Sequence, residues 1–130
     1  MQNFNIFITV VRVNCIYYRG ISVKDRNIVA EISVVPLGTG SAGVSEYVAG
    51  CMDVLAKSSG IKYRLTPMGT ILEGPLDLVL KATRAMHEVP FARGAVRVIT
   101  TLKIDDRCDK SLTMQGKLDA VKKLRPDVNI

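Results

Sequence analysis

The chain has 130 residues, of which 48% are hydrophobic and 23% are charged, so it fits one domain that needs no disulfide or metal to stabilise it. Residues 1–27 carry half of the net charge of +6, and the rest is only mildly basic, without the basic patch and interleaved aromatics of a nucleic-acid-binding protein. Three cysteines, an odd number without C-x-x-C spacing, argue against a disulfide framework and a zinc site and predict a cytoplasmic protein.

Residues 1–27 differ in pattern from the remainder. The apolar run 6–13 is too short to span a membrane. It also lacks the basic start and the small-residue cleavage site of a signal peptide. We interpret 1–27 as an N-terminal extension, either an extra strand or an upstream stretch included by an early start codon, and we place the domain at 28–126.

The domain begins with a predicted strand at 28–35, where apolar side chains recur at every second position. Pro36 is expected to end this strand, and a glycine-rich loop follows at 37–41. Ser41 or Gly43 would then cap a helix that stops at Ser58-Ser59-Gly60. One face of this helix is apolar and carries Val44, Val48, Cys51 and Leu55.

The second half of the domain repeats the pattern of strand and helix. Strands at 61–66 and 68–73 are predicted to form a hairpin. Gly74-Pro75 would open the next helix, and Pro90 and Gly94 would close it. A strand at 95–104 and a short amphipathic helix follow, and the helix carries Met114, Leu118 and Val121 on one side and is stopped by Pro126.

This order predicts an α+β fold, the ferredoxin-like βαββαβ two-layer sandwich with a four-stranded antiparallel sheet and an added C-terminal helix. Two helices would cover one face of the sheet. The other face would carry Val29, Val35 and Ile99 beside polar residues, and such a half-apolar face rarely stays in water. We therefore expect a homo-oligomer, a dimer or tetramer formed through sheet faces, with room for a small-molecule ligand between subunits.

Three segments resemble the thiamine-binding protein family, in the order and at the separations found there. They are AEISVVPLGTG at 30–40, PMGTILEG at 67–74 and RVITTLKIDDR at 97–107. The resemblance covers about residues 28–125. It implies a ferredoxin-like fold, homo-oligomers formed through the sheets, and binding of thiamine or a related pyrimidine without known catalysis.

A site for such a ligand needs an acid near the thiazolium cation, hydroxyls for the pyrimidine and an aromatic or apolar wall. Glu31 and Glu73 are the candidate acids, although either could instead pair with Arg97 or Lys103 on a neighbouring strand. Serine and threonine hydroxyls and tyrosine rings could contact the ligand. The alternative explanations are helix capping or β-propensity for the hydroxyl residues and core packing for the tyrosines. These candidates are Thr39, Ser41, Thr70, Thr101, Tyr47 and Tyr63.

The sequence offers few residues that could carry out catalysis. His87 is the one histidine, so no Ser/His/Asp or Cys/His constellation forms without it. Asp105 and Asp106 are adjacent on an extended segment and point opposite ways, which disfavours a shared metal ion. We expect no metal, no cofactor (thiamine being a ligand), no nucleic acid or membrane partner, and no enzyme activity. The alternatives are a regulatory module for another metabolite, or an enzyme that uses Glu31 or Glu73 with His87.

Overall fold

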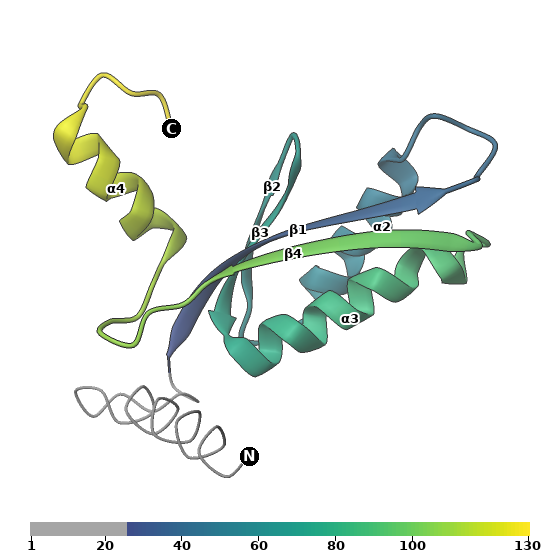
Figure 1. Ribbon diagram of the computed structural model, residues 1–130, viewed down its shortest axis with the longest axis horizontal. Coiled ribbons are helices and arrows are strands. Elements are labelled where there is room, and N and C mark those ends of the chain that lie inside the picture. Colours follow the sequence, from purple (N-terminus) through teal and green to yellow (C-terminus); the bar gives the residue numbers. More distant parts are fainter. Residues whose placement is uncertain (1–25) are drawn as a thin grey trace, which may run out of the picture.

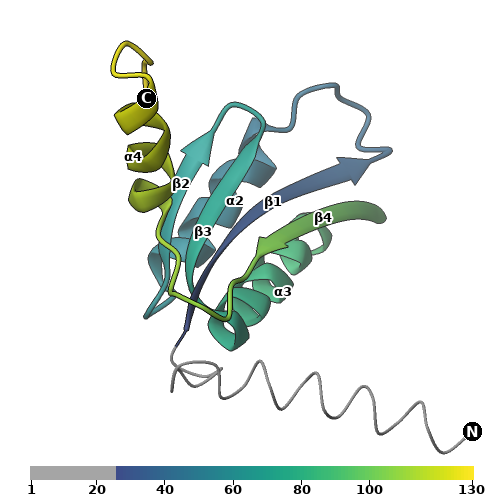
Figure 2. The ribbon, with the colours of Figure 1, turned by 60° about the vertical axis from the view of Figure 1, so that its left-hand side comes forward.

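The computed structural model describes residues 26–130, so the predicted extension at 1–27 lies almost wholly outside the described residues. The four strands form one antiparallel sheet in the order β2-β3-β1-β4. Helices α2 and α3 cover one face of it (Figures 1 and 2). The fold is therefore the predicted ferredoxin-like α+β sandwich. Its elements are β1 (Asn27–Leu37), α2 (Ser45–Ala56), β2 (Lys62–Thr66), β3 (Gly69–Pro75), α3 (Leu76–Ala92), β4 (Arg97–Asp105) and α4 (Met114–Leu124).

The core lies between the sheet and these two helices. Alternate residues of β1, namely Ile28, Ala30 and Ile32, point toward the helices and are almost fully buried. This is the period-2 pattern of a half-buried strand. Full burial of each of the two isoleucine side chains contributes roughly 1.5–3 kcal/mol, and the alanine methyl contributes less. The remaining members of the core cluster are Cys51, Leu55, Leu72, Val79, Ala82 and Met86.

Strand β1 runs past the proline that was expected to end it. Its pairing with β3 stops where Ile32 faces Thr70, whereas its pairing with β4 continues to Leu37. Residues 33–37 therefore have a neighbouring strand on one side only. Pro36 lies in this stretch, where a missing N–H loses no ladder bond on the unpaired side. The prediction that Pro36 ends the strand was wrong for this reason.

Two further prolines occupy positions in the secondary structure that differ from the predicted ones. Pro75 is the last residue of β3 and precedes α3 instead of opening it. Pro90 lies inside α3, which continues to Ala92. A proline has no N–H for the carbonyl four residues earlier, which here is that of Met86. The thiol of Cys51 on α2 donates to this carbonyl at 3.5 Å, so a side chain replaces the missing backbone donor.

Helix α4 extends away from the two-layer body (Figure 1), and none of its residues is buried. Its start is fixed locally, because the Thr113 hydroxyl accepts a hydrogen bond from the Gly116 N–H at 2.9 Å. It is fixed to the sheet by Glu73, whose carboxylate accepts from the Met114 N–H at 2.9 Å. An ion pair between Lys117 and Asp105 adds a contact with β4.

Candidate functional site

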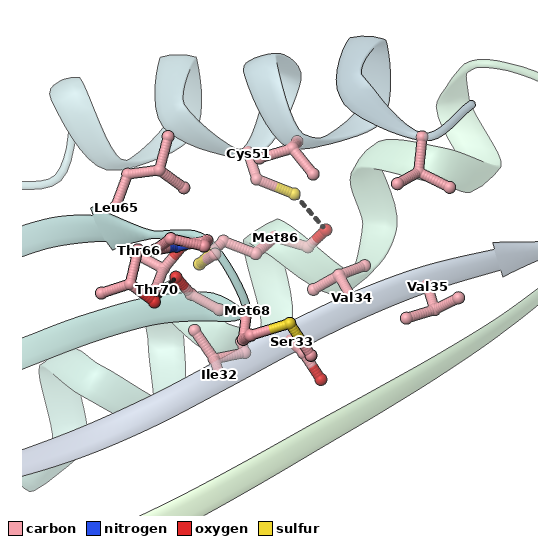
Figure 3. A pocket seen from close by; sticks show the side chains of 14 residues that line it. Ile32, Ser33, Val34, Val35, Cys51, Leu65, Thr66, Met68, Thr70 and Met86 are labelled. Carbon is pink, nitrogen blue, oxygen red and sulfur yellow. Dashed lines mark hydrogen bonds between the residues drawn. The ribbon is translucent and has the colours of Figure 1, made fainter.

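A cavity of about 180 Å³ lies beside the overhanging end of β1. It exists because β3 begins only opposite Ile32, which leaves the place next to residues 33–37 without a strand. The amino-terminal part of α2 and the turn between β2 and β3 enclose this space (Figure 3). The side chains lining it come from these elements and from α3, and include Ser33, Val35, Val48, Cys51, Leu65, Thr66, Met68, Thr70 and Met86.

The polar groups of this cavity are few and uncharged. Thr70 on β3 is 4% exposed and contributes a hydroxyl to the lining. The Thr66 hydroxyl already donates to the Gly69 carbonyl at 2.7 Å. Burial raises the pKa of the Cys51 thiol, an effect that the Arg93 charge partly offsets, so the group stays protonated at neutral pH. The cavity thus presents a few hydroxyls in a largely apolar, uncharged wall, which suits a flat, uncharged ring.

The mouth of the cavity carries a conspicuous apolar side chain. Met68 occupies the tight turn between Pro67 and Gly69 and is 88% exposed. Of the predicted site residues, only Thr70 lines this cavity. The other lining residues were missed because their pattern is that of ordinary core positions. The one available signal was Met68, since a turn gives a large apolar residue nothing to pack against.

Glu73 does not line the cavity and instead holds the start of α4. It is 4% exposed and lies on the face of the sheet away from α2 and α3, where it accepts the hydrogen bond from the Met114 N–H. Lys62 on β2 approaches it at 3.7 Å. Pairing with Arg97 or Lys103 was wrong for Glu73, because β3 has β1 and β2 as neighbours and does not touch β4.

Glu31 and Thr101 lie on the open face, away from the covering helices. Glu31 pairs with Lys103 on β4 at 3.0 Å, directly opposite in the register, which confirms the alternative of a cross-strand ion pair. Thr101 stands opposite Ser33 and is exposed. A shallow depression on this face takes in Glu31, Lys103 and Lys117.

Three other predicted residues gather at the glycine-rich loop. The Thr39 hydroxyl donates to the Ser41 carbonyl at 3.0 Å, and the Ser41 hydroxyl accepts from the Gly43 N–H at 3.2 Å. These are local turn bonds, and neither Ser41 nor Gly43 caps α2, whose preceding residue is Val44. Tyr47 borders the same loop, whereas Tyr63 lies apart on β2 and is partly exposed. The predicted residues therefore fall into separate groups.

Within residues 26–130 no cluster of three or more His, Cys, Asp or Glu side chains could hold a metal ion. No helix in that range is long and apolar enough to cross a membrane. Cys51 is a free, buried thiol, whereas Cys108 is disulfide-bonded. The expectation of no disulfide was wrong at Cys108, since an odd cysteine count leaves one unpaired but does not forbid a pair.

Comparison with known proteins identifies the family. The sequence model described as thiamine-binding protein matches residues 30–122, from β1 into α4. The chain belongs to the thiamine-binding protein family. A UPF0045 protein of Bacillus subtilis, YqgV, is 42% identical over 98 residues, which cover 73% of this chain and 94% of that protein.

Solved structures of related proteins agree with the fold of this family member. The hypothetical protein MJ1052 of Methanocaldococcus jannaschii is 43% identical and superposes with a TM-score of 0.68 over 75% of this chain and 98% of that one. A candidate thiamine biosynthesis/salvage protein of Thermotoga maritima is 21% identical, with a TM-score of 0.61 over 73% and 98% of the two chains. The second likeness shows the fold alone. Membership of the thiamine-binding protein family supports a role in binding a small molecule.

Proposed function

We propose that the protein binds thiamine, or a related pyrimidine or thiazole metabolite, without converting it, as a carrier, buffer or sensor. The observation that carries this proposal is the uncharged, largely apolar cavity itself, whose wall includes Thr70, a residue that is 4% exposed and can offer a hydroxyl to a ring. The cavity volume of about 180 Å³ suits one six-membered ring, since an apolar cavity of roughly 150 Å³ accepts benzene. Family membership supplies the class of ligand.

The chemistry of the cavity wall favours one orientation of thiamine. No charged side chain lines the cavity, and an unpaired cation is expensive to bury. The neutral aminopyrimidine ring would therefore enter, and the cationic thiazolium would stay at the mouth beside Met68. A thioether against a ring is a favourable contact. The Thr70 hydroxyl would form a hydrogen bond with the ring, and such a bond between neutral groups adds roughly 0.5–1.5 kcal/mol.

A second copy of the chain completes this proposal by closing the mouth. Ser33 and Val35 belong to the cavity wall and also to the open face of the sheet. Val35 and Ile99 on that face are large apolar side chains that are 40% and 48% exposed. Pairing of open faces would bury them and place the ligand at a subunit interface.

The absence of conversion rests on the groups near the ring. The titratable group of the cavity wall is the Cys51 thiol, whose pKa is raised by burial and which therefore is a poor nucleophile. His87 lies elsewhere, with its Nδ1 2.8 Å from the Thr100 hydroxyl, and it does not line the cavity.

Isothermal titration of the full chain with thiamine, its phosphates and the free aminopyrimidine tests the proposal. We expect saturable binding near one site per chain and an unchanged ligand by mass spectrometry. Thr70→Val should weaken binding about 2- to 10-fold, the value of one neutral hydrogen bond. Thr39→Val, in the glycine-rich loop and outside the cavity wall, is the matched control and should bind as the wild type does.

Other outcomes would contradict specific parts of this proposal. Absence of heat with every compound would refute the ligand class. Equal weakening in Thr70→Val and Thr39→Val would refute the location in the cavity. Conversion of the ligand that disappears in His87→Ala would favour the enzyme alternative.

A further inference from the structure

The cavity beside residues 33–37 has three sulfur-containing side chains in its wall. They are Cys51 on α2, Met86 on α3 and Met68 in the turn between β2 and β3. Figure 3 shows their sulfur atoms in yellow around the interior of the cavity. The three residues are far apart in the sequence, so the fold alone brings their sulfurs to one place. Binding of a ring, as proposed above, uses the Met68 thioether but neither the thiol nor the buried Met86 thioether.

The remaining lining side chains match only one class of metal ion. They are hydrocarbons and the three hydroxyls of Ser33, Thr66 and Thr70, and no carboxylate or imidazole lines the cavity. Thiolate and thioether sulfurs are soft ligands that suit Cu(I), whereas Mg²⁺, Ca²⁺ and Mn²⁺ prefer oxygen ligands. Residues 26–130 hold no His, Cys, Asp or Glu cluster for a metal, but methionine sulfurs are soft ligands of another kind.

The charge of the cavity wall restricts the ion further. Cys51 is 3% exposed, and burial raises the pKa of its thiol, so a bare thiolate is disfavoured there. A monovalent cation that replaces the thiol proton avoids this cost, because one thiolate and one such ion leave the cavity neutral. A divalent ion would leave a positive charge buried without a counterion. The Arg93 guanidinium, which acts on the same thiol, is itself positive and would oppose that charge.

Met68 provides the route by which an ion could enter. It is 88% exposed at the mouth of the cavity, whereas Cys51 and Met86 are only 3% and 2% exposed. A methionine side chain is unbranched and flexible. Its sulfur could therefore bind an ion at the surface and turn inward with it, while Cys51 and Met86 form the fixed part of the site.

We propose that the cavity binds one Cu(I) ion through the Cys51 thiolate and the thioethers of Met68 and Met86. Binding exchanges the thiol proton for the ion, so that Cys51–SH and Cu⁺ give Cys51–S–Cu and H⁺. The proton passes to solvent, the Met86 carbonyl gives up the hydrogen bond from the thiol, and neither sulfur nor copper changes oxidation state. This inference requires no organic ligand and so does not rest on the proposed function, although a ring and an ion would compete for the cavity.

Titration of the full chain with Ag(I), a redox-stable analogue of Cu(I), tests the site in chloride-free buffer. NMR follows the ¹³C-labelled methyl group of each methionine. The signals of Met68 and Met86 should shift until one equivalent is bound, while those of Met52 and Met114 stay in place. Met52 is the internal control, because it lies on α2 and packs against the core but is outside the cavity wall. Equal shifts at Met52 and Met86, or none at Met68 and Met86, would overturn the site.

Variants separate the ligands from the fold. Cys51→Ser keeps a donor for the Met86 carbonyl but removes the soft sulfur. Groups that merely orient metal ligands already contribute about 10- to 100-fold to affinity, so Cys51→Ser, Met68→Leu and Met86→Leu should each weaken Ag(I) binding at least tenfold. Met52→Leu is the matched control and should bind as the wild type does. Wild-type affinity in any of the three ligand variants would indicate an adventitious ion only and would overturn the proposal.

The pH dependence of Ag(I) binding reports on the exchanged proton. Cys51 is the one titratable residue of the cavity wall, and its thiol is protonated at neutral pH because its pKa is raised. Release of one proton per ion predicts an affinity that rises about tenfold per pH unit near neutrality. An affinity independent of pH would refute binding by the thiolate. Failure to bind thiamine would leave these results unaffected, and failure to bind Ag(I) would leave the proposed function unaffected.

Discussion

Replacement of Glu73 should release α4 from the sheet while leaving the two-layer body folded. The Glu73 carboxylate is buried and accepts the Met114 N–H at 2.9 Å. A hydrogen bond to a charged group is worth roughly 1.5–3 kcal/mol, and a negative charge at a helix amino terminus adds to this. Because no residue of α4 is buried, little else would hold the helix. Glu73→Ala should therefore speed amide exchange in α4 about 10- to 150-fold.

Two variants make this measurement decisive. Glu73→Gln keeps an acceptor oxygen without the charge and should give a smaller acceleration. Glu31→Ala removes a carboxylate from the same face of the sheet, but its ion pair with Lys103 is exposed, so α4 exchange should not change and stability should shift by less than about 0.5 kcal/mol. Unaltered α4 exchange in Glu73→Ala would refute the role assigned to Glu73.

Two further predictions concern stability. Cys51→Val should lower the free energy of unfolding by about 1 kcal/mol or more, because the Met86 carbonyl loses its donor. Adding Pro90→Ala restores a backbone N–H for that carbonyl and should recover most of the loss, as measured by urea unfolding. A wild-type free energy of unfolding for Cys51→Val would contradict this role of the thiol. The Arg26 guanidinium, bonded at 2.6 and 2.8 Å, holds the pKa of Asp106 below its usual range. The stabilisation by this pair is therefore full above the unfolded-state pKa of about 3.9 and is lost as the pH falls through the folded-state pKa. Asp106→Asn should be less stable at pH 7 and lose less stability on acidification, and an equal loss in both proteins would count against this.

The order of strands and helices could be predicted from the sequence because it rests on local periodicity. The alternation of Ile28, Ala30 and Ile32 and the helical spacing of Val48, Cys51 and Leu55 each specify an element and its buried face. The boundaries at prolines were less predictable. Whether Pro36 ends a strand depends on whether a neighbour needs its N–H, and only the length of β3 decides that.

The candidate site was predictable only in part. Of the eight residues proposed from the sequence, Thr70 lines the cavity, because that cavity is a consequence of unequal strand lengths. Glu73 was chosen as a candidate acid, with Arg97 or Lys103 as the alternative partner, yet it bonds to the backbone of Met114, 41 residues later in the chain. A contact of that kind leaves no local pattern in either segment.

The class of fold, the family and the buried face of each element follow from the amino-acid sequence alone, since hydrophobic period and residue identity are properties of neighbouring residues. How far each strand extends beyond the end of its neighbour is visible only in the three-dimensional structure. This difference in length creates both the cavity beside residues 33–37 and the one-sided pairing that tolerates Pro36. Register and overlap are set by the packing of whole elements against one another, and no short window of sequence contains that information.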